Sequence, residues 1–340
     1  MNSEARPTKP RWLKIVKLSV RLLILSLLAY GIWHSVRKGL DDLRAQDFSW
    51  SHINPWWLLV SSLAYFAGTI PSGLFWHKTL WVMGQQPTRF EALRAFTIGH
   101  LGKYVPGKAL VIVLRAGLVR GPRCNTTVAA TAVFIETLTS MAVGAFVAAT
   151  MAAVMFYDRP KLLLLAAALM VCTGVPILPP VFRRAVRILG VRKINPDIDQ
   201  ALAGLTYRLM AYGWLRLIFS WFLYGFSLWA TLRAYQPPGA APVSLQQWPF
   251  ATVCYALAIL AGFVIMVPGG LGVREWVVTR VLAEPFGPGR ALVSAVLVRL
   301  ASLVAESVFA GILYLLKPRD QGPADSEPRV VALDKSANGG

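Results

Sequence analysis

A chain of 340 residues that is 56% hydrophobic and only 15% charged is too apolar to be a soluble domain of this length. Its net charge of +19 does not indicate nucleic-acid binding, because membrane proteins collect Lys and Arg in cytoplasmic loops, where these residues meet anionic headgroups. Several apolar runs reach the ~20 residues that a helix needs to cross a bilayer. The composition therefore predicts an all-α fold, a polytopic membrane helical bundle.

The first apolar run, from Leu18 to Trp33, follows a basic tail at residues 1–13. No small-residue cleavage site ends this run, so we expect it to remain as a membrane span with its N-terminus in the cytoplasm. The next segment, from Arg37 to Asn54, is expected to be an outer loop.

Five further spans are predicted from the remaining long apolar runs. They are Pro55–Trp76, Thr126–Tyr157, Leu162–Pro180, Tyr212–Tyr235 and Arg290–Leu316. The loop after residue 180 is rich in Arg and is expected in the cytoplasm, whereas the uncharged loop QPPGAAPVSLQQWP is expected outside. The polar tail at residues 318–340 is expected to be disordered and cytoplasmic.

Two apolar segments, at about residues 91–119 and 250–283, are each interrupted by Val-Pro-Gly. A Pro-Gly break frees backbone N–H and C=O groups, and such groups are tolerated at membrane depth only when they are buried in protein or line a wet cavity. We interpret both segments as re-entrant hairpins with the Pro-Gly turn at the tip. The alternative is a pair of Pro-kinked spans supported by neighbouring helices, and loop charge agrees with either.

The order of elements suggests an inverted repeat inside one membrane domain, residues 14–317. Each half, 55–157 and 212–316, contains an apolar helix, a Pro-Gly segment and a second long helix. The two closing helices carry an ionisable residue at similar depth, Glu136 in one and Arg299 in the other. With one hairpin entering from each side, the halves are inverted, which is a common plan in alternating-access transporters.

Ionisable residues inside a membrane mark functional sites by default, because each costs at least ~2.5 kcal/mol at the bilayer centre. Eight are candidates for substrate binding: Lys103, Lys108, Arg115, Glu136, Arg274, Glu275, Arg299 and Glu306. Six residues of the turns complete the predicted site: Pro106, Gly107, Pro268, Gly269, Gly270 and Gly272. Cations beside small turn residues are expected to bind an anionic headgroup. For Glu136, Arg299 and Glu306, structural ion pairing is the alternative.

Nothing in the sequence indicates a metal or another cofactor. Cys124, Cys172 and Cys254 are far apart and lie in or beside apolar runs, and the four histidines form no metal-binding pattern. The phosphate-binding motif GxxxxGK[ST] is also absent. Energy for any transport would therefore come from an ion gradient, a lipid gradient or a partner.

Two motifs carry a resemblance to a known family. GKYVPGK (Gly102–Lys108), followed by a helix with Glu136, and VPGGLGVRE (Val267–Glu275) resemble signatures of the lysylphosphatidylglycerol synthase transmembrane family. This flippase-like domain also forms the N-terminus of the bacterial multiple peptide resistance factor. The resemblance covers roughly Leu13 to Leu316 and implies a lipid translocase of the bacterial inner membrane. Because no aminoacyl-transfer domain follows, synthesis of lysylphosphatidylglycerol is not expected.

The leading hypothesis is a flippase for an anionic phospholipid or a polyprenyl lipid, and not an enzyme. The expected partners are membrane lipids with anionic headgroups and an enzyme of lipid or glycan biosynthesis. One alternative is a polyprenyl-phosphate-dependent glycosyltransferase that uses acidic residues of the first outer loop, namely Asp41, Asp42 and Asp47. The other is a non-transporting membrane subunit of a lipid or glycan pathway.

Overall fold

A computed structural model describes residues 11–44, 49–105, 109–155, 160–265 and 268–316, apart from some side chains in the first and sixth helices. The twelve α-helices in this part are α1 (Arg11–Arg44), α2 (Pro55–Val82), α3 (Arg89–His100), α4 (Ala109–Val119), α5 (Thr126–Met155), α6 (Pro160–Gly174), α7 (Pro179–Ile188), α8 (Ile198–Ala203), α9 (Tyr207–Ala234), α10 (Trp248–Val264), α11 (Val273–Phe286) and α12 (Pro288–Leu315). Short 3-10 helices join several of them, including η2 (Leu101–Tyr104) and η6 (Pro268–Gly270).

Five helical segments among the described residues are long and apolar enough to cross a membrane. They are α2, α5, α9, α12 and the run Leu245–Val264, which contains α10. An all-α, multi-pass membrane protein is thereby confirmed. Four of the six predicted spans are among these five, whereas the first and fourth, over α1 and α6, are not. The fifth candidate, Leu245–Val264, overlaps the second predicted hairpin, so the total of six spans stays a prediction.

The predicted span Leu162–Pro180 differs from the observed helix. The helix α6 ends at Gly174, and a 3-10 turn, Val175–Ile177, separates it from α7. Pro176 explains the break, because proline lacks an N–H group and disfavours helical backbone at the preceding residue. Pro179 then occupies the first position of α7, where a proline is well accommodated.

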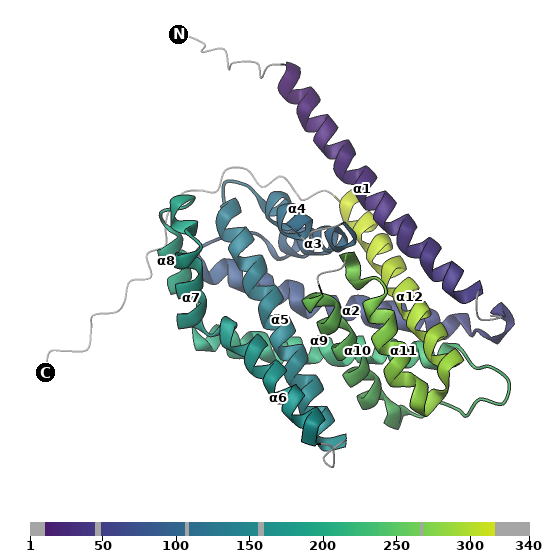
Figure 1. The fold of residues 1–340 in the computed structure, drawn as a ribbon. Helices are drawn as coiled ribbons and strands as arrows, with labels where there is room; N and C mark the ends of the chain where they lie inside the picture. The colour runs from purple at the N-terminus through teal and green to yellow at the C-terminus, as the bar shows by residue number, and fades with distance from the viewer. Residues whose placement is uncertain (1–10, 45–48, 106–108, 156–159, 266–267, 317–340) are drawn as a thin grey trace, which may run out of the picture.

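The helices α2 and α9 form an antiparallel pair through the centre of the bundle (Figure 1). The Ser61 hydroxyl lies 2.9 Å from the Ser227 hydroxyl, while Phe75 lies against Gly213. Small residues at such contacts let two helix backbones approach closely. Because α2 opens the first predicted half and α9 lies in the second, their opposite directions agree with an inverted repeat.

Both Pro-Gly segments turn the chain back on itself. In the first, a Cβ atom on Gly102 would lie 2.7 Å from the backbone nitrogen of Val111, so η2 and α4 are in close contact. In the second, Gly262 of α10 faces Gly270, and Gly269 and Gly270 adopt φ values of 57° and 71°. Such left-handed backbone favours glycine. Whether each hairpin enters and leaves on one side of the membrane stays a prediction.

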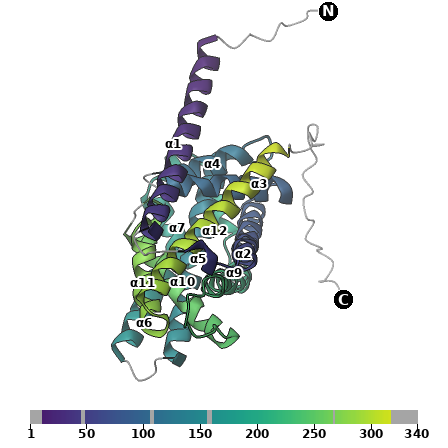
Figure 2. The same ribbon diagram turned by 90° about the vertical axis from the view of Figure 1, so that its right-hand side faces the viewer.

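The long helix α1 packs across both turns. Gly31 of α1 lies against the backbone carbonyl of Tyr104, and the Lys38 Nζ is 3.4 Å from the position of a Cβ on Gly272. Just after these contacts, α1 packs against α12, where Gly39 lies beside Val296 and Leu300. Its N-terminal half extends beyond the other helices (Figure 2). The C-terminal half of α1 thus covers the region where the two Pro-Gly segments approach each other.

Candidate functional site

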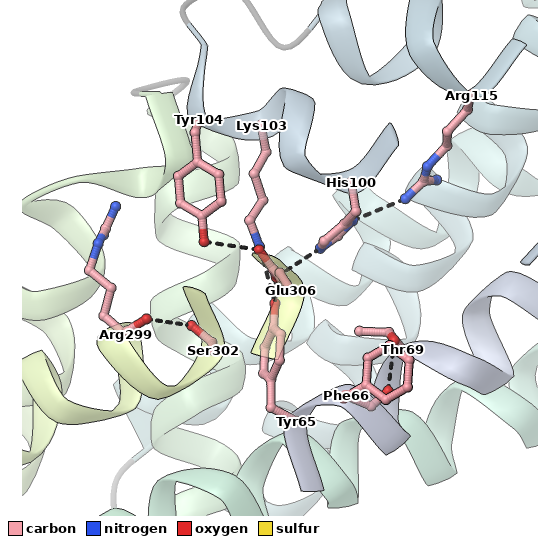
Figure 3. A network of polar contacts seen from close by, with 10 residues as sticks. All are labelled: Tyr65, Phe66, Thr69, His100, Lys103, Tyr104, Arg115, Arg299, Ser302 and Glu306. Atoms are coloured by element: carbon pink, nitrogen blue, oxygen red, sulfur yellow. Dashed lines mark hydrogen bonds and ion pairs between the residues drawn. The ribbon is translucent and has the colours of Figure 1, made fainter. Parts of the chain in front are cut away.

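The carboxylate of Glu306 on α12 is the centre of a buried polar network (Figure 3). Its Oε1 accepts hydrogen bonds from the Tyr65 hydroxyl and from the Lys103 ammonium. Its Oε2 accepts one from the Tyr104 hydroxyl at 2.9 Å. The His100 Nε2 lies 3.5 Å from Oε1. Groups from α2, α3 and η2 therefore converge on one acidic side chain.

His100 connects this network to a second buried ion pair. An Arg115 Nη2 donor lies 3.1 Å from the His100 Nδ1. Since a guanidinium can only donate, Nδ1 must accept, which makes the imidazole neutral with its proton on Nε2, on the side of Glu306. The Arg115 Nη1 donates to Glu136 at 2.7 Å. A continuous polar chain therefore runs from Glu136 through Arg115 and His100 to Glu306.

A third ion pair joins α11 to α12. The Arg299 Nη1 donates to Glu275 Oε1, while Glu275 Oε2 accepts from the backbone N–H of Gly272 at 2.7 Å. Glu275 therefore caps the first turn of α11 and also neutralises a buried cation. The Arg299 Nε and Nη2 are buried and have no hydrogen-bond partner among the described residues.

Arg274 is the cation of this site that has no acidic partner among the described residues. Apart from the neutral His100, the charged residues that line the site or pair with its lining are four cations and three anions: Lys103, Arg115, Arg274 and Arg299, with Glu136, Glu275 and Glu306. Three ion pairs use all three anions, and no described acidic group lies within 4.0 Å of Arg274. Its Nε is buried without a hydrogen-bond partner in the part of the chain described.

Two adjoining cavities share Arg274 and Tyr255 in their walls. The larger, of about 110 Å³, also borders Lys103, Arg115 and Glu136. The smaller, of about 20 Å³, is lined by the Arg299–Glu275 pair and by Gly269. Polar groups converging on buried space suit an anionic group held by guanidinium and ammonium donors.

The two turns meet beside this site. A Cβ on Gly269 would lie 3.3 Å from the Tyr104 ring and 3.3 Å from the Arg299 Nη2, so η2 and η6 are in contact. Two opposed hairpins with Pro-Gly tips predict that Pro106 and Pro268 lie close together, but Pro106, Gly107 and Lys108 lie outside the described residues. The contact of their immediate neighbours agrees with that prediction.

Seven predicted ionisable residues are thus brought together, although several differ from expectation in their partners. Lys103, which was expected to face a phosphate, is paired with Glu306. Glu136 has no charged neighbour in the sequence, yet Arg115 lies beside it. Glu136, Arg299 and Glu306 each form an ion pair, which was the alternative interpretation for these residues. Substrate binding by them stays a prediction.

Sequence reasoning missed three residues that complete the site. Tyr104 and His100 lie in and just before the first Pro-Gly motif, where attention to polar neighbours of the charged positions would have found them. Tyr65 carries no such signal, because it lies within an apolar run of α2. Only the packing of α2 against α12 places its hydroxyl at Glu306.

The alternative glycosyltransferase hypothesis placed Asp41 and Asp42 in an outer loop, but both residues lie in a helix. The helix α1 continues to Arg44, and Asp41 lies 4.0 Å from Arg37 one turn earlier and 3.5 Å from Arg44. Such pairs at helical spacing stabilise the last turns of a helix. The helix therefore continues into the segment predicted as a loop from Arg37, and the observed loop starts only after Arg44. Asp47 lies outside the described residues.

These features define a multi-pass α-helical membrane protein with a charged, partly hollow site inside its bundle. A model of the family described as the lysylphosphatidylglycerol synthase TM region matches residues 15–310. The chain therefore belongs to this family, as the two Pro-Gly motifs indicated. No curated protein matches the sequence.

Proposed function

We propose that this protein is a flippase that moves an anionic lipid headgroup across the bacterial inner membrane. The observation that carries the proposal is Arg274, a cation with an unpartnered buried Nε in the wall shared by two cavities. Arg274 is partly buried, so it is poorly solvated and gains from an anionic partner. A phosphate supplies the missing charge and fits the planar donors of a guanidinium.

The three ion pairs supply further donors as the headgroup enters. Lys103 and Arg299 are each paired with a glutamate, and a phosphate that enters between them replaces those glutamates. When the headgroup leaves, Glu306 and Glu275 return to Lys103 and Arg299, so Arg274 alone is left to attract the next anionic headgroup. The acyl chains remain in lipid throughout. A headgroup from an anionic phospholipid or a polyprenyl lipid meets these requirements, and an enzyme of lipid or glycan biosynthesis is the proposed partner.

Leaflet exchange in liposomes tests the proposal. The purified protein is reconstituted with fluorescent phosphatidylglycerol, cardiolipin or polyprenyl phosphate, and an impermeant quencher reports the fraction in the outer leaflet. Wild type should exchange at least one of these lipids, and Arg274→Gln should slow exchange by about tenfold or more, as loss of a charged contact to the cargo implies. The matched control is Arg184→Gln, an exposed arginine on α7.

Two results would overturn the proposal. One is exchange no faster than in protein-free liposomes with all three lipids. The other is an Arg274→Gln variant that exchanges lipid at the wild-type rate while it remains monodisperse.

A further inference from the structure

The outer surface of the α2–α9 pair is polar at one end and apolar along the rest of its length. Phe75 lies against Gly213, and Val82 lies against Gly204 just before α9 begins. In this antiparallel register, Lys78 of α2 is level with the first turns of α9. Cations near the end of one helix therefore lie beside those near the start of the other.

A pocket of about 430 Å³ occupies this end, lined by Lys78, Thr206, Arg208 and Tyr212. One helical turn further, the guanidinium carbon of Arg216 lies 4.6 Å from the ring centre of Tyr212. Two cations thus line the pocket, and a third stacks on the tyrosine in its wall. Within the described ranges, none of the three forms an ion pair, since the acidic groups there pair with other cations or lie elsewhere.

The surface beyond the pocket is apolar and exposed. On α9, Leu215 and Phe219 follow Arg208 and Tyr212 at helical spacing and are 75% and 59% exposed. On α2, Ile70 lies about two turns before Lys78 and is also exposed. This surface is a furrow with cations at one end and exposed apolar side chains along it. The cations suit the headgroup of a phospholipid, and the apolar side chains suit its acyl chains.

We propose that this furrow of α2 and α9 binds one anionic phospholipid of the surrounding leaflet, separately from the central site. The phosphate lies between Lys78 and Arg208, where the opposite charge is missing and basic side chains attract anionic headgroups. An acyl chain lies along Leu215 and Phe219, which would otherwise contact bulk lipid. The central cavities are walled by other residues, so this lipid is a bound ligand of the outer surface and not the cargo.

Native mass spectrometry of the detergent-solubilised protein tests this site. Wild type should retain phosphatidylglycerol in preference to phosphatidylcholine, and Lys78→Gln/Arg208→Gln should retain about tenfold less, as loss of two headgroup charges implies. The control Arg184→Gln/Lys193→Gln removes two exposed charges elsewhere and should retain lipid as wild type does. Leu215→Asn/Phe219→Asn should weaken retention by removing the contacts to the acyl chain.

The outcomes separate this site from its alternatives. Equal retention by wild type and Lys78→Gln/Arg208→Gln would overturn the proposal, as would equal retention of both lipids. Displacement of the lipid by millimolar glycerol phosphate would instead identify a site for soluble phosphates and also overturn it. Arg274→Gln should retain the lipid, so failure of the flippase proposal and failure of this one are distinguishable.

Discussion

Glu306 shows how a single buried charge is accommodated in this protein. It receives donors from Tyr65, Lys103 and Tyr104, so both oxygens are hydrogen-bonded. A buried ion pair adds little net stability, because desolvation offsets most of the attraction, but removing one partner leaves an uncompensated charge. The residues of the network should therefore be sensitive to single substitutions and tolerant of paired ones.

We predict that Glu306→Gln destabilises the protein by about 3–5 kcal/mol, because Lys103 loses its counterion in a buried position. The melting temperature in detergent, followed by intrinsic fluorescence, measures the effect. Lys103→Met/Glu306→Gln should recover part of the loss, since the orphaned charge is also gone. Glu284→Gln is the control, because Glu284 is exposed. A wild-type melting temperature for Glu306→Gln would show that the pair does not hold the bundle together.

Cys124 gives a prediction about chemical reactivity. It lies between α4 and α5 with a buried side chain, and burial, with a smaller effect of nearby Glu91, raises its pKa to about 11. Burial disfavours the thiolate, so the thiolate fraction at pH 7.5 is on the order of 0.03%, against about a tenth for an ordinary thiol. In a Cys172→Ser/Cys254→Ser background, maleimide should label the folded protein very slowly.

Labelling of Cys124 should accelerate as the pH rises toward 11, because the thiolate population then grows. Addition of sodium dodecyl sulfate should make labelling fast at pH 7.5, which is the control for an intact thiol. Labelling of the folded protein at the rate of a free thiol would contradict the buried placement of Cys124.

At the scale of helices, close packing depends on glycines that face a neighbouring backbone. Gly225 of α9 is such a position, because a Cβ there would strike the backbone of Thr252 on α10. Gly311 on α12 is the opposite case, since no atom would lie within 4 Å of its Cβ among the described residues. The same substitution should therefore have opposite effects at the two sites.

We predict that Gly225→Ala destabilises the protein by about 1–3 kcal/mol, because α9 and α10 must move apart to accommodate the methyl group. Gly311→Ala should stabilise it by up to about 1 kcal/mol, because alanine is the better helix former. Melting temperatures of the two variants give the comparison. A rise for Gly225→Ala would show that α9 and α10 are further apart than described.

For the whole molecule, the basic and uncharged loops predict one orientation in the membrane. Ala185 lies on the Arg-rich helix α7, and Pro238 lies in the uncharged loop after α9. Between them, α9 is the described helix that is long and apolar enough to cross. The two positions should therefore lie on opposite sides, with the basic side in the cytoplasm.

Cysteine labelling in whole cells measures this orientation. An impermeant maleimide should label Pro238→Cys in intact cells and Ala185→Cys only after permeabilisation. The background for both is the protein without its own cysteines. Labelling of both positions from the same side would refute the predicted orientation of α9.

The sequence alone determined the class of the protein and the positions of its main elements. Apolar run length predicts spans at α2, α5, α9 and α12, because each helix satisfies its own backbone in lipid. The Pro-Gly motifs marked the breaks and indicated the family, which the family match confirms. Proline at residue 176 was equally visible, but its effect on the predicted fourth span was missed.

Only the tertiary structure decided which charges pair and which cation is left over. Lys103 and Glu306 are 203 residues apart, and their contact depends on how η2 and α12 pack and rotate. Helical periodicity gives the face of a residue on its own helix, but not the neighbour opposite that face. Tyr65 entered the site, and Arg274 was left without an acidic partner among the described residues, for the same reason. Side-chain pairing in a bundle is a property of packed helices, whereas the position of a membrane helix is a property of a local segment.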